Sequence, residues 1–82
     1  MSDNRIYLGR IGEWIFCKYY FDKENDEFIE EKYHYEYLDT GTVFDSSSTV
    51  SAQHIYDEFV RCKNTSGIEK LFELYDEKLI QK

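Results

Sequence analysis

Residues 28–38 read FIEEKYHYEYL, and the alternation within this stretch decides the fold that the sequence predicts. Its odd-numbered positions are apolar apart from Glu31, and its even-numbered positions are mostly charged. The first set is Ile29, Tyr33, Tyr35 and Tyr37, and the second is Phe28, Glu30, Lys32, His34, Glu36 and Leu38. A two-residue repeat with one apolar face is typical of a half-buried antiparallel strand. We expect the tyrosines to close a small sheet over helices; the alternative is an exposed binding face.

The preceding stretch, residues 13–21 with the sequence EWIFCKYYF, is apolar at both parities. One face carries Trp14, Phe16 and Tyr20, and the other carries Ile15, Cys17, Tyr19 and Phe21. This pattern predicts a central strand that is covered on both sides. A short apolar segment precedes it at residues 6–8, before Gly9 and Gly12, and a polar turn follows at residues 22–27.

On the C-terminal side of the tyrosine-rich strand, residues 39–42 read DTGT and predict a turn. We expect residues 42–44 to pair back as a third strand of the hairpin. The serines at residues 46–48 predict a loop.

Two helices are expected to follow. The first begins near Ala52, with Ser51 or Thr49 as its N-cap. The second begins at Ser66, because Ser66 and Glu69 have the spacing of a capping box. Its apolar stripe comprises Ile68, Leu71, Phe72, Tyr75 and Leu79. The elements predict an α+β fold in a single domain, residues 1–82, with a small N-terminal antiparallel sheet of three to four strands packed by two C-terminal helices.

The net charge of −7 is concentrated in one segment of the chain. Residues 22–45 hold nine of the 17 acidic residues but two of the 10 basic ones, so the remainder holds eight of each. A field of this sign repels nucleic acid and anionic lipid and attracts basic surfaces. We therefore expect a protein partner with a basic surface and no direct binding of nucleic acid.

Short motifs that suggest catalysis lack the context that the chemistry needs. The DTGT sequence at Asp39 matches the motif around the catalytic aspartate of aspartic proteases, but no later apolar-apolar-glycine stretch accompanies it. His34 and Glu36 share a strand face, yet two ligands are too few for a metal site. Cys17 and Cys62 are far apart in the sequence, which favours free thiols in the cytoplasm. The sequence predicts no enzyme, no cofactor and no membrane-spanning segment.

The leading hypothesis is a small non-enzymatic protein-binding module, monomeric or homodimeric, that acts as an inhibitor by occupying a basic, nucleic-acid-binding surface of its partner. In size and charge the chain is similar to phage anti-defence proteins and to immunity proteins of nuclease toxins. The expected partner-binding face is acidic and comprises Asp22, Glu24, Asp26, Glu27, Glu30, Glu36 and Asp39. One alternative is an accessory or structural subunit whose acidic face only confers solubility. A small enzyme using Asp39 is the other alternative.

Overall fold

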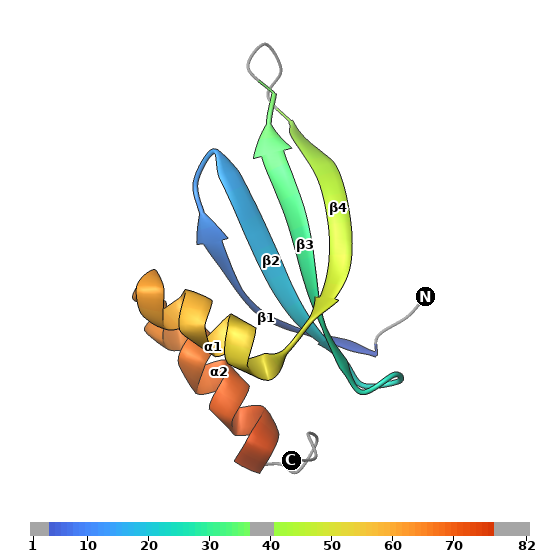
Figure 1. The fold of residues 1–82 in the computed structure, drawn as a ribbon, viewed down its shortest axis with the longest axis vertical. Coiled ribbons are helices and arrows are strands. Elements are labelled where there is room, and N and C mark those ends of the chain that lie inside the picture. The colour runs from blue at the N-terminus through green and yellow to red at the C-terminus, as the bar shows by residue number, and fades with distance from the viewer. Residues whose placement is uncertain (1–3, 37–40, 77–82) are drawn as a thin grey trace.

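The structure of the chain is a computed structural model that describes residues 4–36 and 41–76. Four antiparallel strands form one sheet in the order β1-β2-β3-β4, and two helices follow (Figure 1). The strands are β1 (Arg5–Gly12), β2 (Ile15–Asp22), β3 (Glu27–Tyr35) and β4 (Thr42–Val50), and the helices are α1 (Ala52–Arg61) and α2 (Thr65–Asp76). The predicted α+β fold, with an N-terminal antiparallel sheet and two C-terminal helices, is confirmed.

Two strands are longer than the sequence suggests. β1 continues beyond residue 8, because its register shifts between Tyr7 and Gly9 and then resumes as far as Gly12. Gly12 has a φ of 95°, and a Cβ atom there would lie 2.4 Å from the carbonyl oxygen of Ile15. The tight turn into β2 therefore requires glycine.

The serines of residues 46–48 lie within β4 rather than in the expected loop. They are exposed, and their backbone pairs with β3, where Ser48 lies opposite Glu30. A strand at the edge of a sheet is stabilised mainly by its backbone ladder, so polar side chains are tolerated there. The turn expected at residues 39–42 lies largely outside the described residues.

The helix starts confirm one predicted cap and correct the other. The Ser51 hydroxyl accepts a hydrogen bond from the His54 backbone N–H at 3.0 Å, as expected for the N-cap of α1. In α2, however, the Asn64 side chain accepts the bond from the Gly67 N–H at 2.9 Å. The predicted start at Ser66 is therefore wrong, because Asn64 caps equally well and begins the helix one residue earlier, at Thr65.

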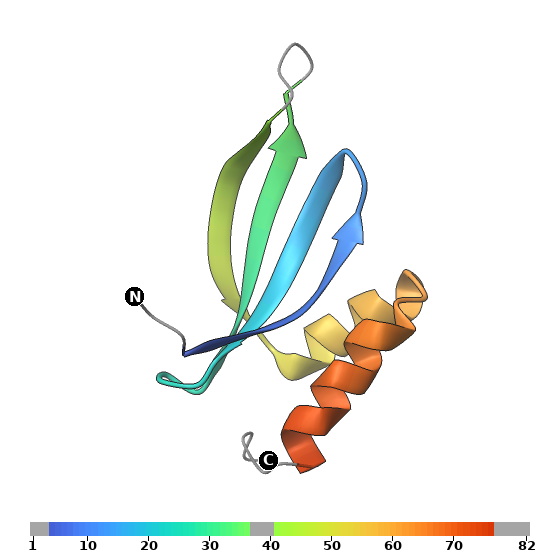
Figure 2. The same ribbon diagram turned by 180° about the vertical axis from the view of Figure 1, so that it is seen from behind.

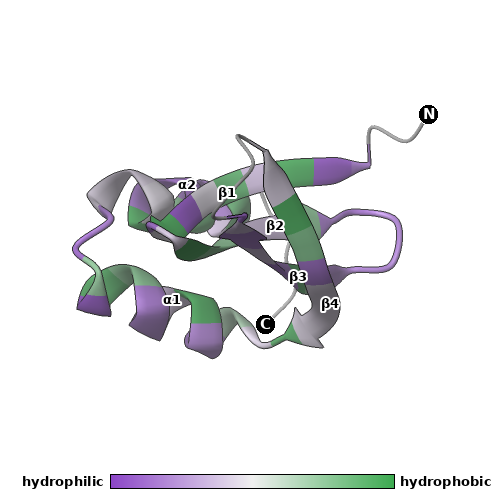
Figure 3. Cartoon of the chain, turned by 90° about the horizontal axis from the view of Figure 1, so that it is seen from above, coloured by the Kyte–Doolittle hydropathy of each residue, from purple (hydrophilic) through white to green (hydrophobic). Residues whose placement is uncertain are grey.

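The core lies between the helices and one face of the sheet (Figures 1, 2 and 3). Its buried members are Leu8, Ile11, Tyr19, Phe21, Phe28, Ile55, Phe59, Leu71 and Leu74. The two helices approach closely at Gly67, where a Cβ atom would lie 2.7 Å from the Phe59 ring. Leu74 is buried in α2 whereas Phe72 is 50% exposed, so the stripe expected to include Phe72 is rotated towards Leu74. Leu79 lies outside the described residues.

The tyrosines of β3 lie on the face of the sheet opposite the helices, so the preferred expectation that they close the core is wrong. The strand register pairs Tyr33 with Phe16, and it pairs Glu30 with the core residue Tyr19. Residues directly opposite one another on neighbouring strands point to the same side. Glu30 therefore lies on the helix-covered face, and Tyr33 and Tyr35 lie on the other. Tyr37 is outside the described residues.

Candidate functional site

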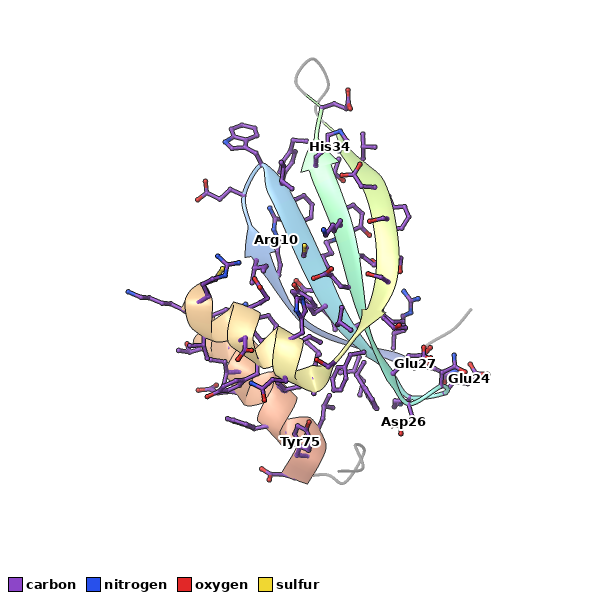
Figure 4. All side chains as sticks on the ribbon, in the orientation of Figure 1. Arg10, Glu24, Asp26, Glu27, His34 and Tyr75 are labelled. Atoms are coloured by element: carbon purple, nitrogen blue, oxygen red, sulfur yellow. The ribbon has the colours of Figure 1, made fainter. Side chains whose placement is uncertain are left out.

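The acidic residues expected to form one partner-binding face are separated into three places. Asp22, Glu24, Asp26 and Glu27 lie in and beside the β2–β3 turn, as Figure 4 shows for the last three. Glu36 directly follows the opposite end of β3. Glu30 is buried between them, and Asp39 lies outside the described residues. The predicted acidic array along one strand face is therefore absent from residues 4–36 and 41–76.

Acids of the β2–β3 turn help to hold the turn itself. The Asp22 carboxylate accepts bonds from the Asn25 side chain at 2.9 Å and from the Glu24 backbone N–H at 3.0 Å. The Asn25 side chain is the main reason why the pKa of Asp22 lies below its ordinary value. Glu24 accepts a bond from the Asn4 side chain at 3.0 Å. This turn brings four of the predicted site residues together on an ordered support.

Glu30 anchors α1 to the sheet. It is 9% exposed, and its carboxylate accepts bonds from the Tyr19 hydroxyl at 2.7 Å and from His54 Nε2 at 3.0 Å. Burial acts to raise the pKa of Glu30, but the bonds from Tyr19 and His54 together hold it below its ordinary value. Burial and the bond to Glu30 both raise the pKa of Tyr19. Glu30 is therefore a charged internal group and is inaccessible to a partner.

The other histidine, His34, lies near the end of the hairpin formed by β3 and β4, away from the helices (Figure 4). Its Nδ1 atom lies 2.8 Å from Asp45, and its Nε2 atom lies 2.9 Å from Glu36. The bonds to Asp45 and Glu36 raise the pKa of His34. His34 thus joins β3 to Asp45 of β4, and it also engages Glu36, which directly follows β3.

The charge of the buried Glu30 also acts on a cysteine of β2. The Cys17 thiol lies on the same face as Tyr19 and Glu30, but burial raises its pKa, as does the charge of Glu30. A protonated thiol is a poor nucleophile. Within the described ranges, no group of three or more histidine, cysteine or acidic side chains is placed to hold a metal ion. No helix in the same ranges is long and apolar enough to cross a membrane.

The open face of the sheet, opposite the helices, gathers aromatic and basic side chains from all four strands. We define the open face by its larger and charged side chains, which are Arg5, Tyr7, Arg10, Phe16, Lys18, Tyr20, Asp22, Glu27, Ile29, Glu31, Tyr33, Tyr35 and Phe44. Tyr7 and Phe44 are 48% and 53% exposed. Sequence reasoning missed this surface as a whole, although residues 13–21 were expected to need cover on both sides.

The rings of the open face are packed against one another. Phe16 stacks on Tyr33 with a ring-centroid distance of 5.2 Å and an interplanar angle of 8°. Tyr33 also meets Phe44 edge-on at 5.5 Å, and Tyr7 lies 5.5 Å from Tyr20. This packing leaves Phe16 only 2% exposed although no helix of the described chain covers it. The surface is therefore rigid and does not need to order its side chains before binding.

All three basic side chains of the open face lie over aromatic rings. The Arg10 guanidinium is 3.8 Å from the Phe16 centroid, the Lys18 ammonium is 5.1 Å from that of Tyr33, and the Arg5 guanidinium is 5.6 Å from that of Tyr20. Such cation–π contacts hold the charges flat against the sheet. The opposing acid is Glu31, which accepts bonds from Arg5 at 2.9 Å and from the Tyr33 hydroxyl at 2.8 Å. The bond to Glu31 raises the pKa of Tyr33 to about 12. Asp22 and Glu27 also share the open face at the β2–β3 turn, so its basic part is the region around Arg10 and Lys18, in a chain of net charge −7.

Two cavities mark the surface. One has a volume of about 400 Å³ and is lined by Arg10, Glu13, Trp14 and Tyr35 at the β1–β2 turn. Trp14 is 75% exposed and meets Tyr35 edge-on at 5.7 Å. The second, of about 300 Å³, lies between the helices and is lined by Ala52, Gln53, Tyr56, Leu71, Phe72 and Tyr75.

Comparison of the chain with protein-family models, with curated proteins and with solved structures found no match.

Proposed function

We propose that the chain is a non-enzymatic protein-binding module that contacts its partner through the open face. The observation that carries the proposal is the exposed, prepacked layer of tyrosine, phenylalanine and arginine side chains on the sheet. Tyrosine, tryptophan and arginine are enriched among the residues that dominate binding energy at protein interfaces. Contiguous exposed apolar surface on a small protein is typical of an interaction site.

The acidic surplus has a supporting role in this proposal. Glu24 and Asp26 lie in the β2–β3 turn, and Asp22 and Glu27 lie at the adjoining end of the open face, so these acids increase solubility. This corresponds to an accessory interaction subunit. The proposal includes a reducing compartment such as the cytoplasm, because Cys17 and Cys62 are both free thiols.

A second candidate function is inhibition by occupying a basic, nucleic-acid-binding surface of the partner. It is favoured by the β2–β3 turn, where Glu24, Asp26 and Glu27 are exposed on one ordered support. In that case the turn enters the basic surface and the open face is secondary.

Capture of partners from the cells that produce the protein can separate the two candidates. One form carries Trp14→Ser and Phe44→Ser, which change side chains that are 75% and 53% exposed. The other carries Glu24→Gln, Asp26→Asn and Glu27→Gln. We expect the open-face form to lose the proteins that the wild type captures and the turn form to keep them.

The reverse result would support the charge-based inhibitor, with capture that weakens between low and physiological salt because exposed charges are screened. Retention of every captured protein by both forms would reject both surfaces. Urea unfolding of each form is the control that separates loss of binding from loss of the fold.

A further inference from the structure

We propose that the open face binds an acidic polypeptide segment, whose carboxylates contact Arg10 and Lys18 while an apolar side chain of the same segment enters the cavity beside Trp14. This inference depends on the proposed function, since it specifies the partner of the same surface. It differs from the expectation drawn from the net charge, which is a basic partner.

The first step in the argument is that Arg10 and Lys18 are unneutralised. Acidic residues outnumber basic ones by 17 to 10, yet neither side chain forms an ion pair with another residue in the described part of the chain. The Arg10 guanidinium donates one long bond, of 3.4 Å, to the Glu13 carbonyl oxygen. Lys18 lies over the Tyr33 ring. Both cations therefore keep most of their donors for a ligand.

The second step is that the two cations are neighbours. Arg10 and Lys18 lie directly opposite each other on β1 and β2. Like charges at such positions destabilise a sheet, and an anion placed between them would relieve the repulsion. Glu31 lies opposite Lys18 on the other side, but its carboxylate is bound to Arg5 and Tyr33. An external carboxylate is thus the group that best complements this pair.

The third step is that the cavity adjoins the cations. Arg10 lines it, together with the exposed Trp14 ring and Tyr35, and its volume of about 400 Å³ accommodates a large side chain. Glu13 also lines the cavity and disfavours an anion inside it. The apolar side chain of the ligand therefore enters the cavity, and its carboxylates remain over Arg10 and Lys18.

Charge distribution favours a polypeptide over nucleic acid as this ligand. Two unpaired cations neutralise about two phosphates, which supports only weak binding at physiological salt. A strand of nucleic acid extending along β2 and β3 would next meet the acids of the β2–β3 turn. A peptide can limit its negative charge to the positions that face Arg10 and Lys18.

The test uses a displayed library of random 12-residue peptides, selected on the purified protein. We expect the selected peptides to combine aspartate or glutamate with an aromatic or aliphatic residue. They should bind Arg10→Gln/Lys18→Gln about tenfold or more weakly than the wild type. The matched control is Lys23→Gln/Lys32→Gln, which removes the same charge from the β2–β3 turn and the helix-side face and should leave affinity unchanged.

Because Arg10 packs on Phe16, the single variant Lys18→Gln and a urea unfolding curve accompany the double variant. Peptides without an acidic preference that still require Trp14 and Phe44 would overturn this inference and leave the proposed function intact. Peptides that ignore the open face, or a selection that yields none, would overturn both. Tighter binding of a 12-nucleotide oligothymidylate, lost in Arg10→Gln/Lys18→Gln, would replace the polypeptide with single-stranded nucleic acid.

Discussion

Both faces of this sheet carry aromatic rings but use them differently. On the covered face, Tyr19 and Phe21 are each 1% exposed beneath the helices, and the polar groups among them are bonded to one another. On the open face, the rings pack against one another, and arginine and lysine side chains lie over them. The covered face has the composition of a protein interior, and the open face has that of an interface. The difference teaches that aromatic content alone does not locate the core.

The comparison is tested most strongly by truncating one ring on each side of the sheet, namely Phe59 of α1, which packs on Tyr19 of the covered face, and Phe44 of the open face. Phe59 is fully buried, so Phe59→Ala should lower the free energy of unfolding by about 3–5 kcal/mol. Phe44→Ala removes a ring that is 53% exposed and should cost about 1 kcal/mol or less. Urea unfolding measures both. Equal losses would mean that the open face is as much a core as the covered one.

The hydroxyl groups of Tyr19 and Tyr33 provide a finer comparison, because each donates to a glutamate. Tyr19→Phe leaves the buried Glu30 with one partner fewer and should destabilise the fold by about 1–3 kcal/mol. Tyr33→Phe, at the more exposed Glu31, should cost less. A larger loss from Tyr33→Phe in urea unfolding would reverse the assignment of the two faces.

The hydrogen bond from Tyr19 to Glu30 should also affect how the stability of the fold depends on pH. Despite burial, hydrogen bonds hold the pKa of Glu30 below its ordinary value in the folded chain. Its stabilising effect is therefore present above the unfolded pKa and is lost as the pH falls through the folded pKa. Tyr19→Phe should move this acid-induced loss to higher pH, whereas Tyr33→Phe should leave it in place.

Substitutions at the start of α2 should change the free energy of unfolding by a smaller amount. Asn64→Ala removes the bond to the Gly67 N–H and a second bond, of 3.1 Å, to the Arg10 carbonyl oxygen. We expect a loss of about 1–2 kcal/mol in urea unfolding. Ser66→Ala, at the residue first expected to cap α2, should change stability by about 0.5 kcal/mol or less. A larger loss of stability from Ser66→Ala than from Asn64→Ala would support the capping box of Ser66 and Glu69 instead.

The smallest effect is expected at His34, beyond the part of the sheet that the helices cover. The bonds to Asp45 and Glu36 raise its pKa in the folded state. The stabilisation is therefore complete below the unfolded pKa of about 6.5 and is lost as the pH rises through the folded value. The protection of the β3 and β4 amides near His34, measured relative to their intrinsic exchange rates, should fall across that pH window. In His34→Gln the exchange should show no such step.

The order of elements was predictable because each depends on local pattern. Alternation predicted a strand at residues 28–38, where β3 comprises Glu27–Tyr35, and helical spacing after Ser51 predicted α1. The side on which the helices pack was not predictable, since period two states which residues share a face but not which face becomes covered. That choice is made by contacts between residues distant in the sequence, such as Phe59 of α1 with Tyr19 of β2.

The candidate site was less predictable than the fold for the same reason. The sequence placed Glu30 and Glu36 together because they share a parity, but His54, 24 residues further on, binds Glu30. Counting charges along the chain also concealed Arg10 and Lys18, which lie in separate strands and become a pair only through the β1–β2 register. The signal available in the sequence was the second apolar face of residues 13–21, which two helices alone cannot cover.

The irregularity in β4 has a consequence for aggregation of the protein at high concentration. The register with β3 shifts where Asp45 falls out of the ladder, and the serines around it are exposed on the outermost strand. A flat, apolar edge strand can pair with the edge strands of neighbouring copies and lead to fibrils. A bulged edge strand that carries an acid and hydroxyl groups disfavours such pairing. The chain can thus expose the aromatic open face for binding while its β4 edge is protected against pairing with other copies.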